Sequence, residues 1–247
     1  MDNRFVRTKL VLGEEALKRI LKSRVAVFGI GGVGSFVVEG LVRSGIGAID
    51  IYDNDTVSIS NINRQLYALE STIGRDKVDV AKERIHDINP EVKVVANKIF
   101  VDEESISKID FSHFDYVVDA IDTVASKVAL AKKAYDYGVN IISAMGAGNK
   151  IDPLSFEVSD IYDTSVCPLA RKMRNELKKV GVKSLKVVYS KENPKSSEDI
   201  NCDNDFSYDD LCVGSIDKKK IIGSVSFVPP VVGYIIVSEV IKDLINI

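Results

Sequence analysis

The 247-residue sequence has only three cysteines, Cys167, Cys202 and Cys212, and they lie far apart. No CxxC pair is present, which argues against a zinc knuckle. An odd number of scattered cysteines, without a signal-peptide pattern at the N-terminus, favours a reducing, cytoplasmic setting. Histidine is also scarce: His86 and His113 have no partner residues that would indicate a general base or a metal site.

Charge is missing from the 18 residues between Ile221 and Ser238. A membrane span is an unfavourable interpretation, because two glycines and two prolines interrupt this stretch and a glutamate follows it. We predict instead a buried strand, a Pro-marked turn and a core or interface helix, with no transmembrane segment. The whole chain is 45% hydrophobic and 28% charged, with a net charge of −3. This composition is typical of a globular protein with a full core, and it excludes disorder and a global attraction to nucleic acid.

Strand and helix patterns alternate along the first 150 residues. Short apolar runs that end at glycine or polar residues predict buried parallel strands, and amphipathic segments lie between them. The predicted strands cover residues 24–28, 48–52, 92–99, 116–119 and 140–144. The predicted helices cover residues 14–21, 34–42 and 77–88, with another that ends at 137. This order predicts an α/β, Rossmann-like fold: a mostly parallel sheet flanked by helices, with right-handed crossovers.

The pattern changes after Gly146. Strands are expected at 156–158 and 185–189, and a final helix from about Val231. Between them, Thr164 or Ser165 can cap a helix that has Pro168 in its first turn. One face of that helix carries the apolar side chains of Leu169, Met173, Leu177 and Val180. We therefore expect a Rossmann-like domain over residues 1–150 and a C-terminal α+β extension over residues 151–247, packed on the same domain.

A glycine-rich loop follows the first strand of this domain and opens a helix. Its glycines, Gly29, Gly31, Gly32 and Gly34, allow a tight turn and a close approach of the backbone to a ligand. The N-terminus of the following helix presents N–H groups and a partial positive charge to phosphate. Asp53, at the end of the second strand, is where an acid that binds ribose belongs. This motif predicts a nucleotide, but it fits a nicotinamide or flavin enzyme as well as an ATP enzyme.

Further polar residues after the second and fourth strands distinguish these chemistries. They are Asp55, Asn61, Arg64, Gln65, Lys77 and Asp122. An enzyme that attacks the α-phosphate of ATP needs cations, because negative charge builds up in the transition state. Arg64 and Lys77 can neutralise that charge, and Asp122 can hold Mg²⁺. Each residue also has an ordinary alternative role as a solvated charge or a helix cap.

The joint arrangement resembles the ubiquitin-activating-like adenylyltransferases. This family includes the enzymes that charge the sulfur-carrier proteins of molybdopterin and thiamine synthesis. The resemblance rests on the strings Gly29–Gly34, Asp53–Val57, Asn61–Gln65 and Gly74–Lys77, and it covers most of residues 1–150. It implies an ATP site with six matching residues, namely Gly32, Asp53, Asn61, Arg64, Lys77 and Asp122.

The N-terminal segment Arg4–Arg7 resembles the part of the same family whose arginine reaches the ATP of a partner subunit. Arg7 is the better candidate for that arginine. This resemblance, together with the apolar C-terminal segments, points to a homodimer.

The second half resembles one branch of the family, the tRNA threonylcarbamoyladenosine dehydratases. Here the matching strings are Thr164–Arg174, Val187–Ser190 and Gly223–Pro229, and Cys167 departs from an expected aspartate. The resemblance implies that ATP adenylates the threonyl carboxylate of the modified adenosine in tRNA. The ureido nitrogen then attacks the activated carbonyl, closes a ring and expels AMP. Ring closure within one molecule needs orientation rather than a covalent enzyme intermediate. We assign no catalytic role to Cys167, and the roles of Cys202 and Cys212 stay open.

A cluster of basic residues gives separate support for a tRNA partner. Between residues 166 and 196, nine basic residues face two acidic ones. They are Arg171, Lys172, Arg174, Lys178, Lys179, Lys183, Lys186, Lys191 and Lys195. Such a cluster can contact tRNA phosphates, although a solvated lysine-rich helix is the ordinary alternative.

Other functions stay open at this stage. The main alternative is an adenylyltransferase that activates the C-terminal carboxylate of a sulfur-carrier protein. A nucleotide-binding scaffold without catalysis is a third hypothesis, and a nicotinamide oxidoreductase is the least favoured. The sequence also leaves open whether a monovalent cation or a sulfur-transfer protein takes part.

Overall fold

The structure is a computed structural model, and it describes residues 3–195 and 222–247. Cys202 and Cys212 lie outside the described residues, so the structure gives no information on them. In the described part, one seven-stranded sheet forms the centre, in the order β3-β2-β1-β4-β5-β7-β6. The strands are β1 Arg24–Phe28, β2 Ala48–Tyr52, β3 Lys93–Asn97, β4 Tyr116–Asp119, β5 Asn140–Ala144, β6 Phe156–Asp160 and β7 Lys186–Ser190. Neighbouring strands pair in parallel except β6, which runs antiparallel to β7.

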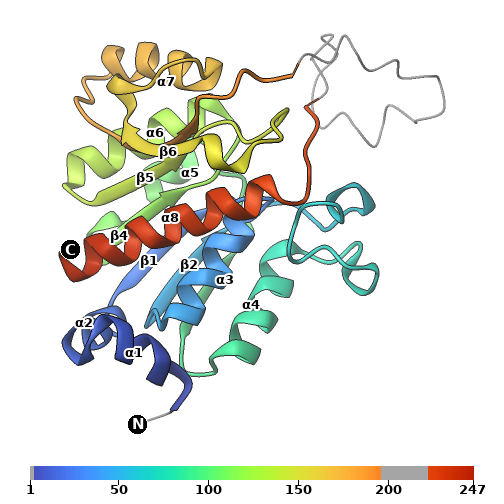
Figure 1. Cartoon of the computed structure of the whole chain (residues 1–247), viewed down its shortest axis with the longest axis vertical. Helices are drawn as coiled ribbons and strands as arrows, with labels where there is room; N and C mark the ends of the chain where they lie inside the picture. Colours follow the sequence, from blue (N-terminus) through green and yellow to red (C-terminus); the bar gives the residue numbers. More distant parts are fainter. Residues whose placement is uncertain (1–2, 196–221) are drawn as a thin grey trace.

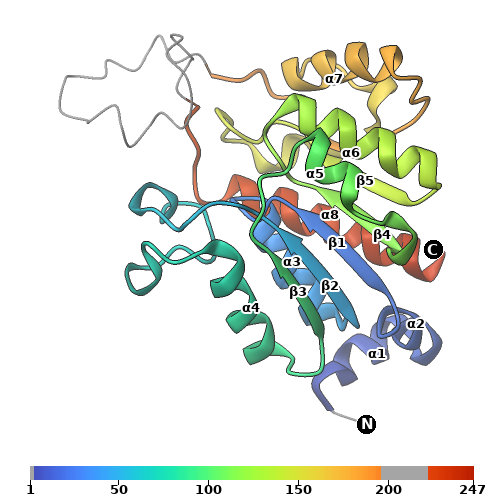
Figure 2. The same ribbon diagram turned by 180° about the vertical axis from the view of Figure 1, so that it is seen from behind.

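Helices cover both faces of the sheet. They are α1 Val6–Leu12, α2 Glu14–Ile20, α3 Gly34–Ser44, α4 Lys77–Ile88, α5 Glu103–Lys108, α6 Val124–Tyr137, α7 Pro168–Lys179 and α8 Val228–Ile245. Helices α3, α4 and α8 lie on the face that Figure 1 presents. Helices α5 and α6 lie on the opposite face, which Figure 2 shows from behind, and α7 packs beside α6. This three-layer arrangement confirms the predicted α/β fold.

Successive side chains of β1 point to opposite faces of the sheet, so the strand contributes to an apolar core on each face. Val25 and Val27 point toward the layer of α3 and α8, whereas Ala26 and Phe28 point toward α5 and α6. All four side chains are fully buried. Because helices cover both faces, a parallel strand of this kind is apolar along its whole length, which is the pattern that the sequence analysis used.

The uncharged C-terminal segment is helical from Val228 onward, and the strand predicted within it is absent from the described residues 222–247. Helix α8 begins at Val228, three residues before the predicted start, with Pro229 and Pro230 in its first turn. Proline fits there because the first helical N–H groups have no partner within the helix. Val232, Ile236 and Val240 bury one face of α8 against the sheet and α3. Within the described residues, no helix is long and apolar enough to cross a membrane.

The start of α7 differs from the prediction. The residue before the helix is Cys167, and neither Thr164 nor Ser165 caps it. Val166 has a positive φ of 59°, so the chain turns sharply between Ser165 and the helix. The hydroxyl of Thr164 instead donates to the carbonyl of Ile161. The predicted apolar face of α7 is correct for Met173 and Leu177 but wrong for Val180, which is exposed.

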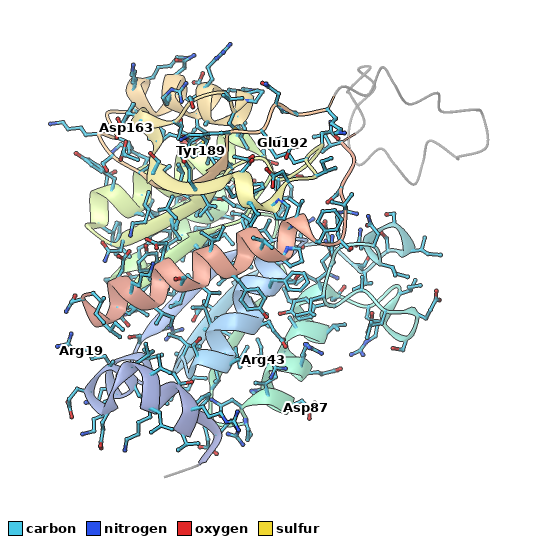
Figure 3. All side chains as sticks on the ribbon, viewed as in Figure 1. Arg19, Arg43, Asp87, Asp163, Tyr189 and Glu192 are labelled. Atoms are coloured by element: carbon cyan, nitrogen blue, oxygen red, sulfur yellow. The ribbon has the colours of Figure 1, made fainter. Side chains whose placement is uncertain are left out.

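The C-terminal extension continues the sheet of the first 150 residues. Strand β7 pairs with β5, and Tyr189 on β7 (labelled in Figure 3) is buried in the same cluster as α7. Helix α8 then returns across the sheet to α3 (Figure 1). Both additions therefore bury their apolar faces on the same sheet. The boundary at residue 150 between two functional parts stays a prediction.

Three short-range features were not predicted or were placed differently. Helices α1 and α5 are too short for a clear apolar period, and the sequence analysis left both out. Strand β3 ends at Asn97 rather than at residue 99. The side-chain amide of Asn97 donates to the carbonyl of Ile51, which closes the strand there.

Candidate functional site

The glycine loop joins β1 to α3 at the carboxyl end of the sheet. Gly29 has a φ of +81°, a conformation that side chains rarely adopt. A Cβ atom on Gly34 would lie 1.8 Å from the carbonyl oxygen of Gly29, so only glycine fits at this position. The loop therefore folds back tightly and presents its backbone and the N-terminus of the 11-residue helix α3 at the sheet edge.

Asp53 follows β2 and holds this loop. Its Oδ2 accepts a hydrogen bond from the backbone N–H of Ile30 at 2.9 Å, and its Oδ1 accepts one from the N–H of Asp55 at 2.9 Å. The side chain is only 10% exposed. Burial raises the pKa of the Asp53 carboxyl above its usual value. The sequence prediction that Asp53 lies at the nucleotide loop is therefore consistent with its position.

Lys77 is the first residue of α4 and is almost completely buried. Its Nζ lies 2.7 Å from Oδ2 of Asp55 and 3.9 Å from Oδ1 of Asp53. The backbone brings the two segments together, since the N–H of Lys77 donates to the carbonyl of Asp55 at 3.1 Å. Lys77, Asp53 and Asp55 thus form one cluster of charges next to Ile30 of the glycine loop.

Arg64 also lies against the glycine loop. A Cβ atom on Gly32 would lie 3.5 Å from Cγ of Arg64, in ordinary van der Waals contact. The guanidinium donates to the carbonyl of Ser60 at 2.8 Å and to Oδ1 of Asn63 at 2.9 Å, and no described carboxylate pairs with it. Burial lowers the pKa of Arg64. A half-buried guanidinium without an acidic partner is a favourable binding group for an anion.

Asn61 and Gln65 shape the segment that carries Arg64. Oδ1 of Asn61 accepts a hydrogen bond from the N–H of Ser58 at 3.2 Å, which closes the 3-10 turn Ile59–Asn61. Gln65 is buried, and its Nε2 would lie 3.6 Å from a Cβ atom on Gly31. Asn61 therefore supports the loop in this structure, whereas Gln65 lies directly against the glycine loop.

The C-terminal segment forms a further wall that the sequence analysis did not foresee. Nδ2 of Asn63 donates to the carbonyl of Ser224 at 2.9 Å. Cβ of Pro229, in the first turn of α8, would lie 3.4 Å from a Cβ atom on Gly32. No local pattern in the sequence could reveal these contacts, because the partners are more than 150 residues apart.

Asp122 lies in the turn after β4, beside the glycine loop. Its carboxylate is exposed and accepts a hydrogen bond from the hydroxyl of Thr123 at 3.3 Å. The preceding residue, Ile121, lies close to Gly29: a Cβ atom on Gly29 would be 3.2 Å from the N atom of Ile121. Asp122 is thus an exposed acid at the same edge as Lys77 and Arg64. No group of three or more metal-binding side chains occurs among the residues described.

Other candidates lie away from this edge. Arg7 is on α1, whose neighbour Phe5 packs against Gly45 at the far end of α3 (Figure 1). The chain's own fold therefore does not bring Arg7 to the glycine loop, and its role at a partner's site stays a prediction. Cys167 is buried before α7. His86 in the last turn of α4 and His113 shortly before β4 are both exposed, and Nε2 of His113 lies 3.2 Å from Oδ2 of Asp110.

The basic cluster divides into paired and unpaired side chains. Lys179, Lys186 and Lys191 form ion pairs with Glu176, Asp243 and Glu157. In contrast, the side chains of Arg171, Lys172 and Lys183 are exposed and make no ion pair or hydrogen bond with any residue that the structure describes. A surface cation that is not committed to an internal acid is available to an external anion.

The site combines two cations, a backbone loop and a helix N-terminus around one position. Lys77 contacts the glycine loop through Asp53, and Arg64 contacts it at Gly32. Such a combination of groups can bind the phosphates of a nucleotide, and Asp53 can accept hydrogen bonds from ribose hydroxyls. A family model described as the ThiF family matches residues 3–247. The chain belongs to the ThiF family.

Two relatives within the ThiF family extend over nearly the whole chain. The tRNA threonylcarbamoyladenosine dehydratase of Bacillus subtilis (strain 168) is 43% identical over 249 residues, which cover 100% of this chain and 96% of that protein. A solved structure of the E. coli tRNA N6-threonylcarbamoyladenosine dehydratase in complex with ATP matches with a TM-score of 0.85 and 32% identity. That match covers 99% of this chain and 94% of the other.

Relatives named as adenylyltransferase and sulfurtransferase match less of the chain. An adenylyltransferase and sulfurtransferase of Vanderwaltozyma polyspora is 36% identical over 138 residues, covering 56% of this chain and 31% of that protein. The similarity to the dehydratases therefore includes the C-terminal extension, whereas this second similarity covers little more than half of the chain.

Proposed function

We propose that this protein is an ATP-dependent enzyme that dehydrates N6-threonylcarbamoyladenosine in tRNA to a cyclic product. The observation that carries the proposal is half-buried Arg64, whose Cγ lies against Gly32 of the glycine loop and whose guanidinium has no carboxylate partner among the described residues. Similarity to named dehydratases over the whole chain supports the choice of substrate.

In the first step, the threonyl carboxylate attacks the α-phosphorus of ATP, and pyrophosphate leaves. The glycine loop and the N-terminus of α3 bind phosphate oxygens, and Asp53 accepts hydrogen bonds from the ribose. Lys77 and Arg64 stabilise the charge that develops on the reacting phosphate and on the leaving pyrophosphate. Because Lys77 is buried and held at 2.7 Å by Asp55, its ammonium is positioned before the nucleotide binds.

In the second step, the ureido nitrogen of the same modified nucleoside attacks the activated carbonyl. A ring forms, AMP leaves, and the nitrogen loses its proton. Both reacting groups belong to one nucleoside, so binding in the correct orientation supplies much of the rate enhancement. The buried thiol of Cys167 has no part in this scheme.

The residues present fit Mg²⁺ as a cofactor of the first step. Magnesium is commonly held by one or two carboxylates together with substrate phosphates. Asp122 offers one exposed carboxylate beside the glycine loop, which fits this type of site. Bound there with ATP, the ion would neutralise phosphate charge. A monovalent cation stays a prediction without a residue assigned to it.

The exposed cations on and after α7 fit the tRNA phosphates. Arg171, Lys172 and Lys183 are free of internal ion pairs among the described residues, and Met173 and Leu177 bury the opposite face of the helix. This supports the prediction that residues 151–247 contribute to tRNA binding. The affinity for tRNA should therefore fall as the salt concentration rises, because binding of this kind releases counterions.

Three further parts of the proposal concern assembly and location. A homodimer would place Arg7 of one subunit at the ATP of the other, since the chain's own fold leaves Arg7 far from its own site. For a tRNA-modifying enzyme, the proposed location is the cytoplasm. A sulfur-transfer protein stays a predicted partner, with no surface assigned to it.

The nature of the carboxylate can be tested by pyrophosphate exchange. Purified protein is incubated with ATP, Mg²⁺ and labelled pyrophosphate, and either threonylcarbamoyl-modified tRNA or a sulfur-carrier protein is added. The proposal predicts AMP release with modified tRNA and no stimulation by the carrier protein. Exchange that depends on the carrier protein, and not on tRNA, would instead support the alternative function.

A further inference from the structure

A buried charge pair lies directly behind the turn that carries Asp122. Asp119 is the last residue of β4, and Lys127 is the fourth residue of α6. Both side chains are 0% exposed, and Nζ of Lys127 lies 3.0 Å from Oδ2 of Asp119. Neither residue is part of the nucleotide site described above, and neither can contact a ligand in solution.

The pair is bonded to the backbone of the turn on both sides. Nζ of Lys127 donates to the carbonyl of Ile121 at 3.1 Å, and the N–H of Ile121 donates to Oδ1 of Asp119 at 3.2 Å. From β5, the hydroxyl of Ser143 donates to Oδ2 of Asp119 at 2.5 Å. Ile121 is therefore fixed through both its N–H and its C=O group, one residue before Asp122.

The same turn presses against the glycine loop. The N–H of Ala120 donates to the carbonyl of Phe28 at 2.8 Å. A Cβ atom on Gly29 would lie only 2.8 Å from the carbonyl oxygen of Ala120. A displacement of this turn would thus move Asp122 and disturb Gly29 at the same time.

Stability alone does not account for the pair. Burial of two charges costs solvation free energy, and replacement of a buried pair by well-packed apolar residues is often neutral or stabilising. Apolar side chains, however, cannot bond to the N–H and C=O of Ile121. The directional bonds of the pair are what an apolar core could not supply.

We infer that Asp119 and Lys127 are positioning residues of the nucleotide site, which hold the Ala120–Asp122 turn against Gly29 and keep the Asp122 carboxylate beside the glycine loop. The inference rests on the proposed ATP-dependent function. It extends that function to two residues that contact neither substrate nor cofactor directly.

The test replaces the buried polar cluster by apolar residues: Asp119→Val, Lys127→Met and Ser143→Ala together. Calorimetry with ATP and Mg²⁺ measures affinity, and thermal unfolding measures stability. The inference predicts an unfolding midpoint close to that of the wild type and an ATP affinity at least tenfold lower. A folded variant with an affinity within twofold of the wild type would overturn it. Ser143→Ala alone, which leaves the bonds to Ile121 in place, is the matched control and retains wild-type affinity.

A second variant covers the case in which the triple variant does not fold. Asp119→Asn with Lys127→Met keeps an acceptor for the N–H of Ile121, and the new amide NH2 can donate to the hydroxyl oxygen of Ser143. The variant removes both charges and the bond to the Ile121 carbonyl. The same affinity loss is expected, and wild-type affinity in this folded variant would overturn the inference.

Coupling to Asp122 separates positioning from a merely structural role. Asp122→Ala lowers ATP affinity in the wild-type background. In the triple apolar variant, Asp122→Ala lowers the ATP affinity by a further factor of less than about two, because Asp122 is already displaced. Additive effects of the two changes would contradict the inference. Wild-type protein that binds ATP but forms no AMP with modified tRNA would refute the proposed function and leave this inference intact.

Discussion

Nζ of Lys77 lies 2.7 Å from Oδ2 of Asp55, and the two residues differ greatly in exposure. Lys77 is 4% exposed, whereas the Asp55 side chain is 52% exposed. The ammonium is thus fixed by an acid at the protein surface, and it is linked to the glycine loop through Asp53, whose carboxylate accepts a hydrogen bond from the N–H of Ile30. Asp55 therefore positions the ammonium group of Lys77, in addition to its predicted place in the nucleotide site.

Lys77→Ala should lower kcat/KM for AMP formation by about 10²–10³-fold, because a preorganised cation is lost at the phosphate. Asp55→Asn should cost roughly tenfold, since Lys77 keeps Asp53 nearby but loses its short contact. Lys98→Ala is the control: Lys98 pairs with Asp76 at 2.8 Å, next to Lys77 in sequence, and is half exposed. Equal decreases in kcat/KM for Lys77→Ala and Lys98→Ala would contradict the proposed role of Lys77 in stabilising phosphate charge.

Arg64→Ala should separate stability from activity. Burial lowers the pKa of Arg64, and no described acid compensates its charge. Removal of the guanidinium should therefore leave the unfolding midpoint unchanged or raise it, while adenylation falls about 10²–10³-fold. Arg43→Ala, which removes an exposed arginine of α3 paired with Glu39 (Arg43 is labelled in Figure 3), should keep full activity. A destabilised but fully active Arg64→Ala protein would exclude the proposed role.

Gly34→Ala should disrupt both the fold of the loop and nucleotide binding. The new Cβ atom would lie 1.8 Å from the carbonyl oxygen of Gly29, so the backbone has to move. We expect a loss of roughly 3 kcal/mol in the free energy of unfolding, together with loss of ATP binding in calorimetry. A Cβ atom on Gly146 would meet no other atom within 4 Å. The free energy of unfolding of Gly146→Ala should therefore lie within about 0.5 kcal/mol of the wild-type value. Wild-type ATP binding by Gly34→Ala would show that the loop tolerates a side chain.

Asp53 gives a prediction for pH dependence. Burial raises its pKa above the usual 3.8, so the folded state binds this proton more tightly than the unfolded chain does. The contribution of Asp53 to stability therefore falls as the pH rises through the window between the unfolded and the raised folded pKa, and it stays lower above that window. The free energy of unfolding of Asp53→Asn minus that of the wild type should increase from about pH 4 upward. Denaturant unfolding across this range measures it, and a constant or decreasing difference would contradict the direction of the shift.

The exposed cations of α7 predict a salt-dependent loss of tRNA binding. Arg171→Glu with Lys172→Glu should weaken tRNA binding and lower the slope of log affinity against log salt by about 1 for each lost phosphate contact. ATP affinity should stay unchanged. Lys22→Glu with Lys93→Glu makes the same change in charge at the amino-terminal edge of the sheet. If this control weakens tRNA binding equally, the effect is one of net charge and not of the α7 surface.

Most of the fold could be predicted because both faces of the parallel strands are buried. The runs Val25–Phe28 and Tyr116–Val118 are then apolar and buried, and the loops that follow these strands carry the candidate site residues. The errors arise where tertiary contacts decide. Val166 adopts a positive φ that removes Thr164 and Ser165 from the cap position of α7. The residues before Val228 predict a strand. In the structure, however, the backbone of Gly223 and Ser224 bonds to the side chains of Asn149 and Asn63 instead of pairing with the sheet.

The candidate site could be predicted where it depends on strand ends. Asp53, Lys77 and Arg64 lie at carboxyl ends of parallel strands or in the loops after them, and the topology brings such residues to one edge. The supporting residues could not be found in this way. The sequence pattern predicts Lys127 as a surface lysine of an amphipathic helix, but its side chain is fully buried and paired with Asp119. Pairings of this kind depend on three-dimensional packing and leave no local period in the sequence.

The most direct measurement combines purified protein, ATP, Mg²⁺ and tRNA that carries threonylcarbamoyladenosine, followed by nucleoside mass spectrometry. The proposed function predicts a cyclic nucleoside lighter by one water, formed in equal amount with AMP. This product should be absent when ATP is omitted and strongly reduced when Arg64 is replaced by alanine. An unchanged threonylcarbamoyl nucleoside and no AMP, from wild-type protein that binds both ATP and the tRNA, would contradict it.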